Sequence, residues 1–270
     1  MRLLLVQHSA GADPEQARVG TAAAVQAALA AQPRRPDLVV LPEATQVDFG
    51  SGDDLAERAE PLDGPFVAMI ASLAAGAGVT VVAGMFERHP QGEPPSNTVV
   101  AVGPDGTLLA AYRKVHLYDA FGYRESDRVA AGPPQPVVLD VPAAGDALRV
   151  GLLTCYDLRF PEQARVLVDA GADLLVLPAA WLAGDQKVEH WRTLLRARAI
   201  ENTVYVAAAG KAGTRYCGGS SLVDPMGVVL AEAPLDADGW VAGEATPQRV
   251  AQVREVNPSL ANRRWRVVAR

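Results

Sequence analysis

The chain has 270 residues and a mass of 28.4 kDa, with 49% hydrophobic and 21% charged residues. This composition is typical of a folded globular protein, and no apolar run approaches the ~18 residues of a membrane span. The formal net charge of −6 gives no overall attraction to nucleic-acid phosphates or to anionic lipids, so we expect neither nucleic acid nor a membrane as a partner.

The amino-terminal stretch favours a cytoplasmic protein, and the cysteine and histidine content limits the metal and disulfide chemistry that we expect. The apolar run at 3–6 is shorter than the ~7–15-residue apolar region of a signal peptide. Two cysteines, Cys155 and Cys217, are too few for a disulfide framework or a four-cysteine zinc site. The four histidines lack the close spacing of metal-ligand pairs, so we expect no metal. Lysine is rarer still and occurs only at 114, 187 and 211.

The first half of the chain alternates predicted strands with predicted helices. We expect helices at Pro14–Gln32 and Pro65–Ala77. We expect strands at Leu3–Gln7, Asp37–Leu41, Val79–Phe86, Asn97–Val102 and Thr107–Tyr112. Val19, Val25 and Leu29 are expected on one apolar stripe of the first helix. A polar loop is expected through Gly50–Asp54, and Gly103–Gly106 predicts a hairpin between the last two strands.

The second half repeats this order. We expect helices at Pro161–Ala170 and Val188–Glu201. We expect strands at Leu148–Thr154, at Asp173–Leu177, which Pro178 ends, and at Val204–Ala209, Ser220–Val223 and Val228–Ala231. The letters repeat too: PDLVVLPEA at 36–44 resembles ADLLVLPAA at 172–180, and VGPDGTLLA at 102–110 resembles VDPMGVVLA at 223–231. The repeat predicts two fused halves related by a pseudo-twofold axis.

Apolar strands interleaved with helices predict an α/β fold with helices covering the sheets. With two similar halves, we expect a four-layer α-β-β-α sandwich. The best candidate for a joint is Pro133–Pro142, which leads into the second half. We therefore expect one domain spanning residues 1–270.

Three chemically capable side chains each follow an apolar strand: Glu43, Lys114 and Cys155. Ligands gather at the carboxyl ends of strands in such sheets. Cysteine is a strong nucleophile only as a thiolate, so it needs a base and a cation nearby. Glu43 can take the thiol proton, while Lys114 and the backbone N–H of Tyr156 can stabilise an oxyanion. Taken singly, however, each residue type is more often structural than catalytic.

The segments around these residues resemble the nitrilase superfamily of carbon–nitrogen hydrolases. The matching segments are LPE at 41–43, YRKVHLYD at 112–119 and CYDLRFPE at 155–162, with further matches at 190–210, 219–231 and 262–264. The resemblance implies Glu43 as general base and acid, Lys114 as stabiliser of the oxyanion, and Cys155 as the nucleophile that forms a thioester. Glu125, within YRES, matches a second glutamate that orients the lysine and the substrate. The family also implies the sandwich fold, no metal or organic cofactor, and a homodimer.

The segment CYDLRFPE is similar to the Nit amidase branch, whose members act on small amides that carry a carboxylate. Such substrates include ω-amides of 2-oxo-dicarboxylic acids and deaminated glutathione. Arg159 is therefore predicted either to bind the substrate carboxylate or to pair with Asp157 or Glu162. Pocket walls are predicted at Tyr118, Tyr156 and Trp181, although aromatic residues at strand ends are equally often part of the core. The loops at 115–124 and 44–52 depart from the ω-amidase pattern.

These features together predict a cytoplasmic, cofactor-independent amidase that converts a small aliphatic, carboxylate-bearing amide to an acid and ammonia. One alternative is hydrolysis of N-carbamoyl amino acids, which also releases carbon dioxide. The alternative from another class is a homologue without activity that serves in binding or assembly. His116, His190 and Cys217 are expected in structural roles.

Overall fold

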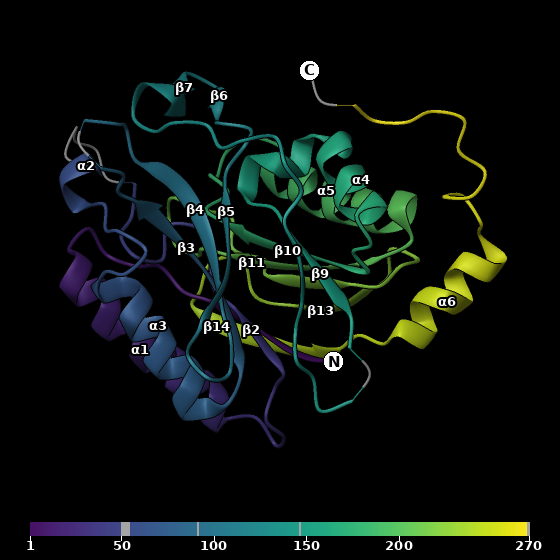
Figure 1. Cartoon of the computed structure of the whole chain (residues 1–270), viewed down its shortest axis with the longest axis horizontal. Helices are drawn as coiled ribbons and strands as arrows, with labels where there is room; N and C mark the ends of the chain where they lie inside the picture. The colour runs from purple at the N-terminus through teal and green to yellow at the C-terminus, as the bar shows by residue number, and fades with distance from the viewer. Residues whose placement is uncertain (50–54, 91, 146, 269–270) are drawn as a thin grey trace.

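In the part of the chain that the structure describes, residues 1–49, 55–90, 92–145 and 147–268, the strands form two six-stranded sheets and a short ribbon (Figure 1). The structure is a computed structural model. The strands of the first sheet are, in spatial order, β14 (Gly239–Glu244), β1 (Arg2–Gln7), β2 (Leu38–Val40), β3 (Thr80–Glu87), β4 (Ser96–Val102) and β5 (Leu108–Arg113). The strands of the second sheet are, in spatial order, β13 (Val229–Glu232), β12 (Ser221–Val223), β11 (Tyr205–Gly210), β10 (Leu174–Ala179), β9 (Arg149–Leu152) and β8 (Val138–Asp140). The ribbon pairs β6, Asp119–Ala120, with β7, Tyr123–Arg124.

Helices cover the outer face of each sheet. The α-helices are α1 (Pro14–Ala30), α2 (Leu55–Arg58), α3 (Pro65–Ala77), α4 (Pro161–Asp169), α5 (Lys187–Asn202) and α6 (Pro247–Val256), and the 3-10 helices are η1 (Glu125–Asp127) and η2 (Cys155–Arg159). In β1, Leu3 and Leu5 join an apolar cluster shared by both sheets, whereas Leu4 and Val6 join a cluster with α1 and α3. A third cluster joins the second sheet to α4 and α5. These clusters separate four layers, so the predicted α-β-β-α sandwich is confirmed (Figure 1).

The two sheets follow one plan. In each, three strands run parallel and are followed by two antiparallel strands: β1-β2-β3 then β4 and β5, and β9-β10-β11 then β12 and β13. The sequences that repeat between the halves occupy equivalent strands, because PDLVVLPEA contains β2 and ADLLVLPAA contains β10. The repeat seen in the letters is thus a repeat of strand order.

Two local expectations were wrong. Val19 is 68% exposed, because the buried side of α1 carries Ala17, Thr21, Val25 and Ala28 at helical spacing and Val19 falls outside it. The strand β10 does not end at Pro178 but continues to Ala179. Pairing between β9 and β10 stops at Val176, so a proline, which has no N–H, is tolerated two residues later.

Other elements had no counterpart among the expected ones. The proposed joint at 133–142 contains β8, which extends the second sheet, and β14 and α6 follow the last expected strand. The expected polar loop at 50–54 lies outside the described residues. Among the helices that the structure describes, none is both long and apolar enough to cross a membrane.

Candidate active site

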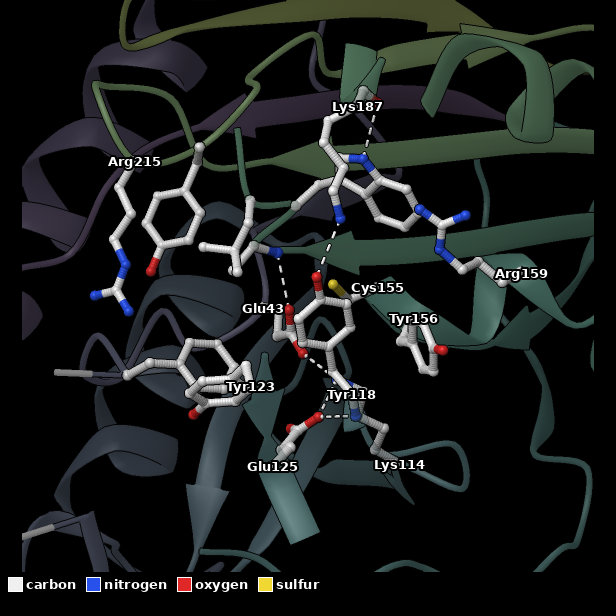
Figure 2. A pocket seen from close by; sticks show the side chains of 15 residues that line it. Glu43, Lys114, Tyr118, Tyr123, Glu125, Cys155, Tyr156, Arg159, Lys187 and Arg215 are labelled. Atoms are coloured by element: carbon white, nitrogen blue, oxygen red, sulfur yellow. Dashed lines mark hydrogen bonds and ion pairs between the residues drawn. The ribbon is translucent and has the colours of Figure 1, made fainter. Parts of the chain in front are cut away.

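Three strand ends bring the candidate side chains together at one edge of the sandwich. Glu43 lies three residues after β2, Lys114 directly follows β5, and Cys155 lies three residues after β9. The first two belong to one sheet and the third to the other, so the site lies between the halves. All three line one pocket (Figure 2).

Lys114 lies between two buried carboxylates. Its Nζ is 2.9 Å from Oε1 of Glu43 and 2.9 Å from Oε2 of Glu125, and each of the three side chains is 1% exposed. The Nδ2 of Asn97 donates to Oε1 of both glutamates at 2.8 Å. The backbone N–H of Ala180, from the second half, donates to Oε2 of Glu43 at 2.8 Å. Glu43, Lys114 and Glu125, each of them a predicted site residue, therefore form one hydrogen-bonded unit.

The charges in this unit are fixed by their mutual attraction. Burial by itself lowers the pKa of Lys114, but the adjacent Glu125 and Glu43 carboxylates raise that pKa well above its ordinary value. Burial by itself raises the pKa of Glu43, but the charge of Lys114 and hydrogen bonds from Lys114, Cys155 and Asn97 leave it below its ordinary value. At neutral pH Lys114 is therefore an ammonium ion and Glu43 a carboxylate.

Cys155 occupies a sharp turn at the start of η2. Its φ angle of 45° lies in the left-handed region. Residues other than glycine rarely adopt this backbone conformation, and those that do are often found at functional sites. Burial and the neighbouring Glu43 carboxylate raise the pKa of the thiol well above its ordinary value, so the resting group is a thiol hydrogen-bonded to Glu43. The N–H of Tyr156 lies in the first turn of η2, where N–H groups lack acceptors within the helix.

Asp157 holds this turn in place. Its fully buried carboxylate accepts hydrogen bonds from the N–H of Thr154 at 2.9 Å and from the hydroxyl of Tyr112 at 2.7 Å. It also accepts from the N–H of His116, whose ring lies against the same carboxylate and stacks on Phe160. His116 therefore has the structural position expected for it.

Aromatic rings form much of the pocket wall. The predicted residues Tyr118, Tyr156 and Trp181 all line the pocket, and Tyr118 and Tyr156 contact each other edge to face. Pocket-lining residues that were not predicted from the sequence as site residues are Phe49, Tyr123, Ala180, Leu182, Lys187, Arg215 and Tyr216.

Arg159 also lines the pocket and does not form the alternative ion pair. Among the described residues, neither Asp157 nor Glu162 pairs with its guanidinium, which lies over the Trp181 ring at 4.8 Å and near Nδ1 of His190 at 3.3 Å. Its Nε is buried without a hydrogen-bond partner. The part of the chain that the structure describes therefore does not contain the ion pair predicted as one alternative for Arg159.

The remaining candidates lie outside the hydrogen-bonded unit. Cys217 is buried beside the pocket wall, and its Sγ lies 3.6 Å from the carbonyl of Leu182. Within the described residues, no group of three or more His, Cys, Asp and Glu side chains could hold a metal ion. Asn97 lies in β4 and Ala180 directly follows β10. Local sequence could not identify either one, because they meet Glu43 only in the folded chain.

The sequence and the fold both have clear relatives. The pattern of the carbon–nitrogen hydrolase family matches residues 5–255. The chain is 41% identical to a deaminated glutathione amidase of Escherichia coli O157:H7 over 90% of this chain and 91% of that one. It is 33% identical to an omega-amidase of Xenopus laevis over 84% of this chain and 83% of that one. A CN-hydrolase superfamily protein of Xanthomonas campestris, solved with an arsenic adduct in its active site, has a TM-score of 0.85 at 32% identity and covers 100% of this chain and 99% of its own.

Proposed function

Because this chain belongs to the carbon–nitrogen hydrolase family and is an amidase, we propose that it hydrolyses a small aliphatic amide bearing a carboxylate, with Cys155 as the nucleophile. The observation that carries this proposal is the buried contact of Glu43 with both Lys114 and the Cys155 thiol. A carboxylate, an ammonium ion and a thiol meet at the pocket floor, and each has a role in acyl transfer.

In the first half of the reaction, Sγ of Cys155 attacks the amide carbonyl carbon while its proton passes to Glu43. The resting thiol has a raised pKa and Glu43 a lowered one, so this transfer is unfavourable until the carbon–sulfur bond begins to form. The negative charge that develops on oxygen is stabilised by the Lys114 ammonium and the Tyr156 N–H. Glu43 then gives the proton to the amide nitrogen, and the carbon–nitrogen bond breaks. Ammonia departs, and the acyl group stays bound to Cys155 as a thioester.

In the second half, a water molecule replaces ammonia. Glu43 removes its proton as the oxygen attacks the thioester carbon, and the released thiolate regains the proton, which yields the acid and free enzyme. Glu125 holds Lys114 in place through both halves. It also accepts the N–H of Tyr118 at 2.7 Å, which links it to the pocket wall.

The substrate class follows from the charge of the pocket and from the relatives. Arg159 faces the pocket without a carboxylate partner among the described residues, so it is available to a substrate carboxylate. Two relatives are named for amides, deaminated glutathione in one case and ω-amides in the other. We assign this chain to the same class of carboxylate-bearing amides.

The experiment is acid and ammonia release from a panel of ω-amides, deaminated glutathione, N-carbamoyl amino acids and simple aliphatic amides. We expect hydrolysis of the carboxylate-bearing amides, which Cys155→Ala abolishes and Cys217→Ala leaves intact. Release of carbon dioxide from N-carbamoyl amino acids at a higher kcat/KM would replace the proposed substrate class. Near-full turnover by Cys155→Ala would overturn the mechanism.

The assembly and location expected from the sequence are also proposals. We propose a cytoplasmic homodimer, and the support for association is a set of exposed apolar side chains, among them Val256 and Trp265.

A further inference from the structure

All three lysines of the chain are buried, although the mechanism uses only Lys114. Lys211 is buried beneath the backbone that follows Glu43, where Nζ donates to the carbonyl of Ala44 at 2.9 Å. Lys187, the first residue of α5, is only 7% exposed and lines the pocket itself. A buried cation in a pocket that the mechanism does not use calls for an explanation.

Among the residues that the structure describes, Lys187 has no acidic partner. Its Nζ donates to the hydroxyl of Tyr118 at 3.0 Å and lies 3.6 Å from the centroid of the Phe121 ring. Across the described residues, no carboxylate forms an ion pair with it. The carbonyl of Lys187 accepts a hydrogen bond from the Trp181 indole at 2.9 Å, which fixes the start of α5 against the pocket wall.

A second cation lies against the same rings. The Arg159 guanidinium is 5.7 Å from the Phe121 centroid and 4.8 Å from the Trp181 centroid, and the Lys187 ammonium is 6.0 Å from the latter. Burial lowers the pKa of Lys187, and the charge of Arg159 lowers it further. Figure 2 shows both side chains on the pocket wall beside Cys155, with Arg215 on the other side.

Two like charges without a counter-ion repel each other, and aromatic faces offset this only in part. A carboxylate between them would give each cation an acceptor, and the Arg159 Nε is buried without one. Lys187 also lines the same pocket as Cys155. An anion held there therefore lies within a short aliphatic chain of the nucleophile.

We propose that Lys187 and Arg159 together bind the carboxylate of the substrate, and that Lys187 is a specificity-determining residue that selects anionic over neutral amides. This inference rests on the proposed amidase function. The substrate it describes has a few methylene groups between a carboxylate and the scissile amide. Glutaramate is such a compound, and pentanamide is a neutral analogue with the same number of carbons.

The test compares kcat/KM for glutaramate and pentanamide in wild type, Lys187→Met and Lys187→Arg. Loss of one charge-assisted hydrogen bond predicts that Lys187→Met lowers kcat/KM for glutaramate about 10- to 100-fold, mainly through KM. The value for pentanamide stays within about twofold, and Lys187→Arg restores most of the glutaramate activity. Arg192→Met, which removes a half-exposed charge from the same helix outside the pocket, serves as the matched control.

An equal loss on both amides would mean that Lys187 only supports the fold, and no loss on either would remove it from substrate binding. Either result overturns the proposal. Calorimetric titration with glutarate, which cannot be hydrolysed, separates this inference from the amidase proposal. Glutarate binding that Lys187→Met weakens at least tenfold supports the anion site even if no tested amide is cleaved. Failure of wild type to bind glutarate contradicts the anion site even if neutral amides are cleaved.

Discussion

The Glu43 carboxylate has two neighbours with opposite effects on the chemistry. Lys114 keeps it ionised, which makes it a weak base, whereas the Cys155 thiol needs a base to react. Proton transfer must therefore be coupled to attack on a bound carbonyl. This arrangement keeps the nucleophile protonated when the pocket holds no substrate.

The first prediction is the position of the acid limb of activity. Glu43 acts as a base only when ionised, and its folded-state pKa lies below the ordinary value of 4.5, so activity is lost only as the pH falls through that lower pKa. We expect kcat/KM to be flat from about pH 6 to pH 8 and to fall only below pH 4.5. The measurement uses pentanamide, because the carboxylate of glutaramate titrates in the same range. A midpoint above pH 5, with the fold intact by circular dichroism, would contradict this charge state.

The second prediction concerns Glu125, which holds Lys114 in place. Glu125→Gln keeps an acceptor for the Tyr118 N–H but leaves Lys114 with one carboxylate instead of two. We expect kcat to fall about 10- to 100-fold with little change in KM, because Lys114 loses its fixed position at the developing oxyanion. The exposed Glu15→Gln is the control. An unchanged kcat for Glu125→Gln would show that Glu43 and Asn97 position Lys114 without it.

At the scale of elements, β3 supports the loop that carries Glu43. The N–H of Gly84 in β3 donates to the carbonyl of Pro42 at 3.1 Å, and its carbonyl accepts the N–H of Thr45 at 2.9 Å. The loop lies so close that a Cβ added at Gly84 would be 2.6 Å from the Cα of Glu43. Only glycine allows this approach.

Gly84→Ala is therefore expected to displace Glu43 and to lower kcat about 100-fold, since a shift of ~1 Å in a catalytic group costs that much. Gly76→Ala is the matched control. It lies on the exposed side of α3 with open space at its Cβ, and alanine there should stabilise the helix by up to about 1 kcal/mol without changing kcat. Equal activity of the two variants would show that the contact between β3 and the Glu43 loop is not critical.

The elements differ in how far sequence could predict them. The buried strands β2 and β10 are continuous apolar runs, so their position and the polar residues that follow them were predictable. The strand β14 contains two glycines and alternates half-buried with exposed residues, and α6 buries only Val250 and Val253. Such weak patterns do not distinguish these elements from loops.

The same reasoning applies to the site. Glu43, Lys114 and Cys155 are polar residues at strand ends, which is a local signal. The Ala180 N–H donates to Glu43 across 137 positions of sequence, and no local pattern encodes that contact. Lys187 stood out only because lysine is rare in this chain, and its place in the pocket required the fold.

At the scale of the whole molecule, large apolar side chains remain exposed at several places among the described residues, including one group near β13 and one near the carboxyl end. Met226, Val228 and Leu230 are 47–53% exposed in and before β13, and Val256 and Trp265 are 77% and 89% exposed near the carboxyl end, which extends away from the sandwich (Figure 1). Exposed apolar groups of this kind mark surfaces that associate.

We predict a solution mass of twice 28.4 kDa at micromolar concentration, measured by light scattering after gel filtration. Trp265→Ser should weaken the dimer if the carboxyl-terminal segment is part of the interface, whereas Trp240→Ser, a change at a half-exposed tryptophan in β14, is the control. A mass of 28.4 kDa for the wild type would contradict the dimer.

The most direct test of the central claim is rapid acid quench of the wild-type enzyme during glutaramate turnover, followed by peptide mass spectrometry. The account predicts an acyl adduct on the peptide that contains Cys155 and no adduct on the peptide that contains Cys217. Added hydroxylamine should release the acyl group from Cys155 as the hydroxamate. Turnover without any adduct on Cys155, combined with undiminished activity of Cys155→Ala, would contradict it.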